Sequence, residues 1–337
     1  MTSESATLII GPSWVGDMVM AQCLFAALKQ QAPNTPIDVV GPDWASPVLA
    51  RMVEVRSTIP VPFRHGEFAL ARRIAFGTQL KGQYTSAYVL PGSWKSAVIP
   101  AAAAIQRRCG YLREWRHGLL NDIRVLHDGV KLKTAIAFQA LADPEVLVDP
   151  SRLFKPKLRH DADNRKRLLI KYGLCDENYV VFAPGAEFGE AKRWPPSYWA
   201  QLARVIRNTG TKVAILGSAA DRETGAAIAA GDAAILNLAG KTRLEDAIDL
   251  ISACKVAVSN DSGLMHIAAA VGVPVAAIYG STSPLDTPPL SSRAEIVSLA
   301  LPCSPCRSRR CPLGHTDCMN KMMPEQIAAR MNTMAVL

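Results

Sequence analysis

The sequence is poor in aromatic residues and has no long apolar segment. Aromatic side chains make up 6% of the 337 residues. Charge, proline or glycine interrupts each apolar run before it reaches the about 18 residues that a membrane-spanning helix needs. The N-terminus, MTSESATLII, has neither the basic region nor the cleavage site of a secretory signal peptide. We therefore expect a cytoplasmic protein.

The loop GPSWVGD, Gly11 to Asp17, follows an apolar run as a phosphate-binding loop does, but it lacks the signatures of one. It matches neither G-x-G-x-x-G nor G-x-x-x-x-G-K-[ST], so it gives little support to dinucleotide binding or to triphosphate hydrolysis. It ends on a carboxylate in the first turn of a predicted helix, where the helix dipole favours the ionised form. Asp17 is therefore a candidate general base, and the alternative is a helix N-cap.

The chain is basic, with a formal net charge of +9 and a pI of about 9.2. Such a charge suits a nucleic acid, a phosphorylated sugar or an acidic membrane surface, unless it has no role in binding. The basic residues between Arg51 and Arg167 are scattered singles and pairs. Nucleic-acid binding would call for aromatic residues interleaved with them, and the scarcity of aromatics speaks against it.

Short apolar runs alternate with helical patterns along the chain, which indicates parallel sheets connected by helices. We expect strands at Thr7–Ile10, Ile37–Val40, Ala87–Leu90 and Ile123–Val125, then at Tyr179–Ala183, Lys212–Leu216, Ala234–Leu238, Val256–Ser259 and Val275–Ile278. The proline-rich, charged stretch 143–178 is the expected linker. We predict two Rossmann-like domains facing a cleft, over residues 1–160 and 161–322, and a C-terminal helix over 323–337 that packs back on the first domain.

The sharpest polar stretch follows the predicted strand Val256–Ser259. Ser262 and Gly263 open a helix there, and the free N–H groups of its first turn form an anion site. His266 lies one turn further, near the same anion, and Asp261 is placed to bind sugar hydroxyls. The alternative is a capped helix with a buried histidine.

Two further loops agree with a nucleotide-diphosphate site. Lys192 precedes a helix that starts at Pro195 and Pro196, and it is placed to reach a diphosphate. Asp221 or Glu223 follows a glycine turn at a strand end, the usual position of a ribose ligand.

These motifs resemble the ADP-heptose:lipopolysaccharide heptosyltransferases of glycosyltransferase family 9. The resemblance covers nearly the whole chain and is carried by GPSWVGDMVMAQ (11–22), KRWP (192–195), NDSGLMHIAAA (260–270) and YGSTSP (279–284). The cysteine-rich tail resembles the type II branch of the family. A sugar-nucleotide epimerase or dehydrogenase is the alternative enzyme, but it requires a dinucleotide fingerprint or a second base that the sequence does not show.

The resemblance implies a GT-B fold and an inverting transfer of heptose from ADP-heptose, without a cofactor. It implies a phosphorylated, Kdo-bearing lipid A core acceptor at the inner face of the inner membrane. The implied base is Asp17, and the implied donor ligands are Lys192, Asp261, Ser262, Gly263 and His266. Basic residues of the first half fit an anionic acceptor, and we assign to it Arg64, Lys95, Arg113 and Arg116. The segment EFGE (187–190) departs from the Thr or Ser that the family often has there.

Four of the eight cysteines lie close together, at Cys303, Cys306, Cys311 and Cys318. In a cytosolic chain, such spacing indicates metal ligands or reduced thiols before disulfides. Because gaps of two, four and six residues are irregular for a zinc ribbon, we expect thiols and no metal. A structural metal site is the alternative, in which His315 is a less favoured participant.

Overall fold

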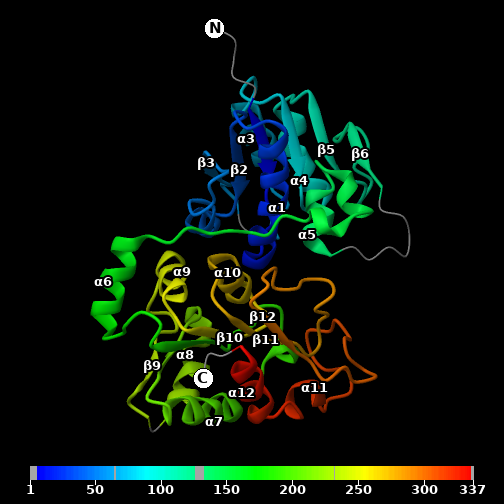
Figure 1. Ribbon diagram of the computed structural model, residues 1–337. Coiled ribbons are helices and arrows are strands. Elements are labelled where there is room, and N and C mark those ends of the chain that lie inside the picture. The colour runs from blue at the N-terminus through cyan, green and yellow to red at the C-terminus, as the bar shows by residue number, and fades with distance from the viewer. Residues whose placement is uncertain (1–5, 64–65, 126–132, 231, 335–337) are drawn as a thin grey trace. The chain divides into compact units, whose positions relative to one another are not determined.

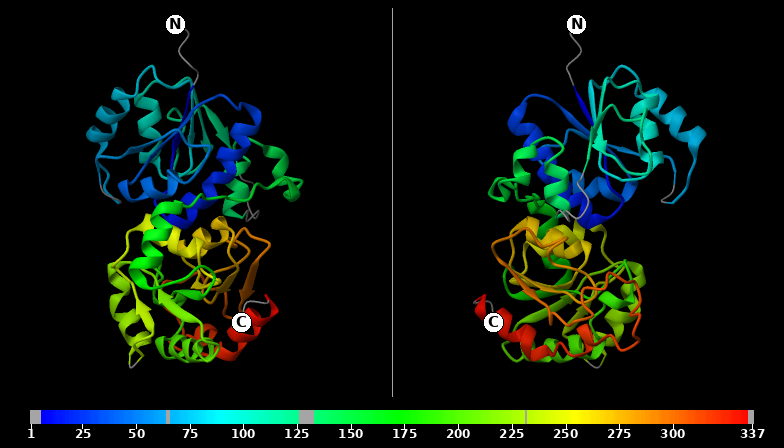
Figure 2. Two further views of the ribbon diagram at one scale, coloured as in Figure 1. Left: turned by 60° about the vertical axis from the view of Figure 1, so that its left-hand side comes forward. Right: turned by 90° about the vertical axis from the view of Figure 1, so that its right-hand side faces the viewer.

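The computed structural model describes residues 6–63, 66–125, 133–230 and 232–334. Contacts within the chain divide it into two units, Met1–Pro156 and Lys157–Leu337. The predicted boundary after residue 160 falls a few residues later, inside the expected linker. Each unit consists of a parallel sheet with helices on both faces (Figures 1 and 2).

The first unit has six strands in its described part, in the order β3-β2-β1-β4-β5-β6, and all pairs are parallel. The strands are β1 (Thr7–Ile10), β2 (Ile37–Gly41), β3 (Ser57–Pro60), β4 (Ser86–Val89), β5 (Arg107–Tyr111) and β6 (Asp122–Arg124). The helices are α1 (Val15–Gln31), α2 (Ser46–Leu49), α3 (Leu70–Gln79), α4 (Trp94–Ala102) and α5 (Thr134–Gln139).

The second unit repeats this strand order, as β12-β11-β10-β7-β8-β9 over its described residues. The strands are β7 (Tyr179–Ala183), β8 (Lys212–Ile215), β9 (Ile235–Asn237), β10 (Val256–Asn260), β11 (Val275–Ile278) and β12 (Ala294–Val297). The helices are α6 (Ala162–Tyr172), α7 (Pro196–Arg207), α8 (Arg222–Ala229), α9 (Leu244–Ser252), α10 (Gly263–Val271), α11 (Asp317–Asn320) and α12 (Pro324–Thr333).

Each sheet has the strand order of a dinucleotide-binding Rossmann domain, in which the direction of winding reverses once. The reversal lies between β1 and β4 in the first unit and between β7 and β10 in the second. Ligands of open α/β sheets bind beyond the carboxyl ends of the strands at this point. The loops that follow β1, β7 and β10 are therefore the first places to look for function.

All nine predicted strands are present, but β3, β5 and β12 were missed. The edge strand β3 is largely exposed, and β12 (AEIV) is only partly buried, so neither forms an apolar run. The strand β5 begins with Arg107, which pairs with Asp122 of β6 at 2.8 Å. Opposite charges can pair across neighbouring strands, so a strand can begin with charged residues. A search for apolar runs does not find such a strand.

The packing of two helices depends on the fold. In α1, residues 18–25 are all buried, because this helix packs on both α2 and α5. The helix α12 was predicted to pack on the first domain. Its Ile327 and Met331 are instead part of the hydrophobic core of the second unit, and α12 lies along α7. None of the described helices is long and apolar enough to cross a bilayer.

Candidate functional site

Most of the predicted donor-binding residues gather at the carboxyl ends of β7, β10 and β11. Lys192 ends a short 3-10 helix in the loop after β7, and its ammonium group lies 2.6 Å from Oδ2 of Asp261, which directly follows β10. The hydroxyl of Thr282, after β11, donates to the same oxygen at 2.6 Å. The Lys192 and Asp261 side chains are only 13% and 5% exposed. The fold therefore fixes an ammonium group, paired with a carboxylate, at the strand ends close to the winding reversal.

The loops after β7 and β10 are tied together by Asn260. Its side-chain amide donates to the carbonyl of Pro184 at 2.6 Å and accepts the backbone N–H of Trp194 at 3.3 Å. A second support for Lys192 is the ring of Phe188, whose centroid lies 5.0 Å from the ammonium nitrogen. Neither role was predicted. Asn260 stands within a motif that we had singled out, but a link to a residue so distant in sequence has no local signal.

The helix α10 begins at Gly263, two residues after Asp261 of this ion pair. Ser262 is its N-cap residue but makes no side-chain capping bond, and its hydroxyl lies 3.0 Å from that of Ser259 instead. The first N–H groups of a helix have no partner within the helix, and together with the dipole they attract anions. The predicted anion site at Ser262 and Gly263 therefore has the required local geometry.

His266 lies in the next turn of α10 and is 5% exposed. Burial lowers the pKa of His266 to about 4; the charge of Asp261 opposes this shift and that of Lys192 adds to it. The imidazole is therefore neutral at pH 7, so it can act as a hydrogen-bond partner but not as a cation.

The two acids predicted to hold a ribose occupy different environments. Asp221 is buried, and its Oδ2 accepts the backbone N–H and the hydroxyl of Ser218, both at 2.9 Å. A Cβ added at Gly185 or Gly217 would come within 2.7 or 2.8 Å of its carboxylate oxygens. Asp221 thus closes a turn between two glycine loops. Glu223, in the first turn of α8, is exposed.

In the first unit, the loop after β1 leads into α1, which begins at Val15. Asp17 is the third residue of that helix and is half-buried, whereas the N-cap position belongs to Trp14. The N-cap alternative for Asp17 is therefore wrong. Its position at the winding reversal of the first sheet remains compatible with a ligand-facing acid, and its role as a base remains a prediction.

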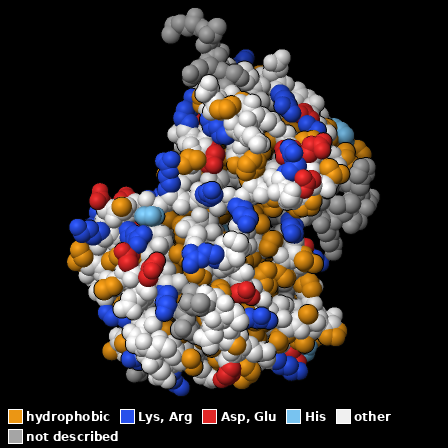
Figure 3. Space-filling view, viewed as in Figure 1, with side chains coloured by type: hydrophobic (Ala, Val, Ile, Leu, Met, Phe, Trp, Pro, Cys, Tyr) orange, Lys and Arg blue, Asp and Glu red, His pale blue; other side chains and the backbone are white. Residues whose placement is uncertain are grey.

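The predicted acceptor cations that the structure describes lie in different surroundings. Arg64 lies outside the described residues. Lys95 donates to the carbonyls of Gly66 and Glu67 at 3.0 and 3.3 Å, whereas Arg113 is exposed and its stem packs over Gly92. On the face shown in Figure 3, Lys and Arg side chains are scattered among apolar and uncharged groups.

Arg116 differs from the other predicted cations because its side chain is fully buried. Its guanidinium donates to the carbonyl of Pro91 at 2.6 Å and to that of Tyr111. These carbonyls follow β4 and end β5, so Arg116 joins the ends of two neighbouring strands. In this structure it is a structural residue, and the prediction that it binds the acceptor is corrected accordingly.

Two parallel Rossmann-like units in one chain are the architecture of GT-B glycosyltransferases, and they confirm the predicted fold class. Comparison with known proteins narrows the class. The model of the family described as "Glycosyltransferase family 9 (heptosyltransferase)" matches residues 73–317. The chain belongs to this family.

Individual relatives agree with the family. The chain is 40% identical to lipopolysaccharide heptosyltransferase 2 of Escherichia coli, with 97% of each chain covered. It is 46% identical to lipooligosaccharide heptosyltransferase 2 of Haemophilus influenzae, over 87% of this chain and 88% of that one. The solved structure of Escherichia coli ADP-heptose lipopolysaccharide heptosyltransferase II matches with a TM-score of 0.85 and 38% identity over 98% of each chain. The protein is a glycosyltransferase, and the epimerase alternative has less support.

Proposed function

We propose that the protein transfers heptose from ADP-heptose to the first heptose of a lipopolysaccharide inner core, as the names of its relatives imply. The observation that carries the proposal is the Lys192–Asp261 pair at the uncapped N-terminus of α10. A fixed cation beside unpaired helix N–H groups suits a diphosphate better than a neutral ligand.

On the donor side, the ammonium of Lys192, the N–H groups at Ser262 and Gly263, and neutral His266 bind the diphosphate. In the transfer, the bond between the anomeric carbon and the diphosphate oxygen breaks, and that oxygen gains negative charge. Donors already aligned on it stabilise the charge as it develops. Asp261 is then positioned beside the sugar, where its carboxylate accepts hydrogen bonds from heptose hydroxyls.

On the acceptor side, we assign the general base to Asp17. An acceptor hydroxyl loses its proton to this carboxylate while its oxygen forms the new bond to the anomeric carbon, with inversion at that carbon. Lys95, Arg113 and Arg64 are the proposed partners of acceptor phosphates and carboxylates. Among the described ones, exposed Arg113 is the better candidate, since Lys95 already holds backbone carbonyls.

The acceptor is a lipid, so the protein must meet it at a membrane surface. We propose a cytoplasmic protein that associates peripherally with the inner face of the inner membrane. Its net charge of +9 supports this location, since anionic headgroups attract basic proteins.

The test is a screen of donors and acceptors with the purified protein. We expect ADP release only when ADP-heptose is combined with an inner-core acceptor that already carries one heptose, and mass spectrometry should show that acceptor gaining one heptose unit. ADP-glucose as donor, and an acceptor without heptose, are the controls. Equal activity on the acceptor without heptose, or release of ADP without a heptosylated product, would contradict the proposal.

A further inference from the structure

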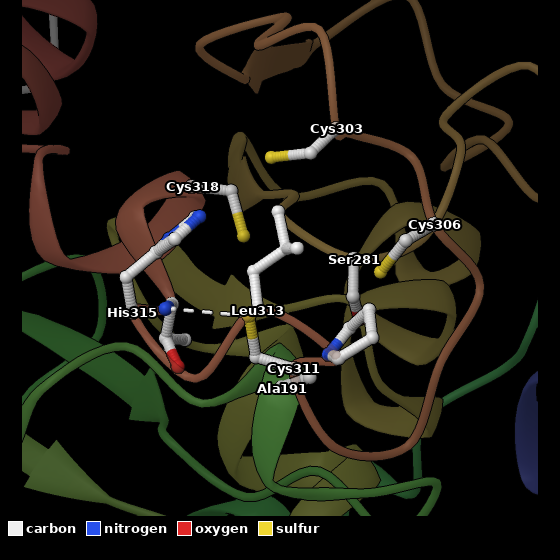
Figure 4. Close-up of a pocket in the computed structure, with 10 residues that line it drawn as sticks. Ala191, Ser281, Cys303, Cys306, Cys311, Leu313, His315 and Cys318 are labelled. Atoms are coloured by element: carbon white, nitrogen blue, oxygen red, sulfur yellow. Dashed lines mark hydrogen bonds between the residues drawn. The ribbon is translucent and has the colours of Figure 1, made fainter.

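The four cysteines of the C-terminal segment converge on one cavity. All eight cysteines of the chain are described and are free thiols. Four of them, Cys303, Cys306, Cys311 and Cys318, line a small pocket together with Ala191 and Ser281 from the donor loops (Figure 4). Cys303, Cys306 and Cys311 are partly buried, and Cys318 is buried. The proposed transfer uses none of them.

The cavity is large enough for one ion or one water molecule. Its volume of about 20 Å³ suffices for a single water-sized species. Among the described residues, no three Cys, His, Asp or Glu side chains are close enough together to hold an ion in this structure. If all four sulfurs are to bind one ion, they must therefore move closer together than they are in this structure.

The backbone beside the thiols donates to one sulfur and has residues in the left-handed region. The sulfur of Cys311 accepts the backbone N–H of Thr316 at 3.4 Å. Arg307, directly after the C-x-x-C pair, has a φ of +56°, and Gly314, in the turn after Cys311, has a φ of +75°. A left-handed conformation is costly for arginine. In metal sites, N–H groups that donate to a ligand help to hold it in the orientation that binds the metal.

The same segment is bonded to the donor loops. The carbonyl of Arg309 accepts the N–H of Ala191 at 3.1 Å, and the N–H of Arg307 donates to the carbonyl of Ser281 at 2.6 Å. Gly189 lies so close to Arg309 that a Cβ there would be 2.4 Å from its carbonyl oxygen. These contacts flank Lys192 on one side and Thr282 on the other. Whatever fixes the cysteine segment also fixes the loops that carry both residues.

We propose that Cys303, Cys306, Cys311 and Cys318 bind one thiophilic divalent metal ion, of the Zn²⁺ class, as a structural site behind the donor loops. Each thiol gives its proton to solvent as its sulfur binds, and four thiolates close the tetrahedral coordination with no open position for catalysis. Sequence spacing had favoured free thiols, but convergence in space outweighs an irregular interval in the chain.

The test uses Co²⁺ as a spectroscopic probe of the reduced, metal-free full-length protein. We expect intense sulfur-to-cobalt charge-transfer absorption that saturates at about one ion per chain and is displaced by Zn²⁺. The double variant Cys303→Ser/Cys306→Ser should lose the absorption, and Cys175→Ser, at an exposed cysteine outside the segment, should keep it. Absence of the absorption in the wild type, or its persistence in the double variant, would overturn the proposal.

Because the double variant can fail to fold, a second measurement uses the wild type alone. Thiols are alkylated with and without bound Zn²⁺, and the modified positions are mapped by mass spectrometry. We expect Zn²⁺ to protect the four cysteines at least tenfold in rate while Cys175 reacts equally in both samples, an expectation on the order of magnitude set by the affinity of structural zinc sites. Equal alkylation of the four would overturn the proposal. Neither readout depends on heptosyl transfer, so the site stands or falls separately from the proposed function.

Discussion

The two units share one strand order but differ in how their polar residues are arranged at the winding reversal. In the second unit, Lys192, Asp261 and Thr282 come from three loops and form one bonded, nearly buried cluster. In the first unit, Asp17 is half-buried on α1, and the predicted acceptor cations lie in different surroundings.

The difference follows from what each unit is proposed to bind. A diphosphate is small and constant, so a rigid set of donors can be aligned with it in advance. A lipid-linked oligosaccharide is large, and exposed cations such as Arg113 suit it better than a closed cluster. On the proposed function, the second unit carries a preformed donor site and the first unit a more open acceptor surface, and four experiments test that contrast.

The largest expected effect is on turnover in Asp17→Ala. Loss of a general base should lower turnover by about 100-fold or more and leave ADP affinity unchanged. Steady-state kinetics and ADP titration measure the two quantities. Asp163→Ala, which removes an acid from the first turn of α6, is the control. Normal turnover in Asp17→Ala would place the base elsewhere.

The next largest effect is on stability at low pH and comes from His266. The pKa of this imidazole is about 4 in the folded protein and about 6.5 in the unfolded chain. The unfolded state therefore binds the extra proton between these values, and stability falls as the pH is lowered from 6.5 to 4, by up to about 3 kcal/mol. Urea unfolding at several pH values should show that His266→Gln loses this part of the dependence. Parallel pH profiles for wild type and variant would contradict the assignment.

Arg116→Met should lower the free energy of unfolding by about 2 kcal/mol. The substitution leaves the carbonyls of Pro91 and Tyr111 without the guanidinium that donates to them. Arg113→Met, at an exposed position, should not change stability and should instead raise the KM for the acceptor. Thermal unfolding and acceptor titration separate the two. A stable Arg116→Met protein with a raised acceptor KM would restore Arg116 as a ligand.

The smallest expected effect is that of Thr282→Val. Removing a hydroxyl that orients the carboxylate of Asp261 should raise the KM for ADP-heptose several-fold, equivalent to about 1 kcal/mol. Because Asp261 is assigned to the sugar, the affinity for ADP alone should change less. Thr333→Val, on α12, is the control. An equal loss of affinity for ADP and for ADP-heptose would assign Thr282 to the nucleotide portion.

The donor loops were predictable because their residues follow apolar strands directly. Asp261, Ser262 and Gly263 come at the end of a buried strand, and parallel strands place their carboxyl ends at one edge. The strand order itself, and the tie between Asn260 and Pro184, required the folded chain.

Other assignments depend on the fold because sequence alone does not show burial. Arg116 is as charged as Arg113 in the sequence, yet only the fold shows that its guanidinium lies under the ends of β4 and β5. Asp221 likewise had the position of a ribose ligand, but the fold uses its carboxylate to close a turn. The placement of α12 depended on the shape of the core around α7, which apolar periodicity does not specify.

Calorimetric titration of ADP into wild type and Lys192→Met tests the central claim, that a fixed cation in the second unit holds the diphosphate. We predict a Kd at least about tenfold higher for the variant, the usual value of a charge-assisted bond. The double variant Lys192→Met/Asp261→Asn, which leaves no unpaired buried carboxylate, should bind equally weakly, and exposed Lys166→Met should bind as the wild type does. An unchanged ADP affinity in Lys192→Met would contradict the account.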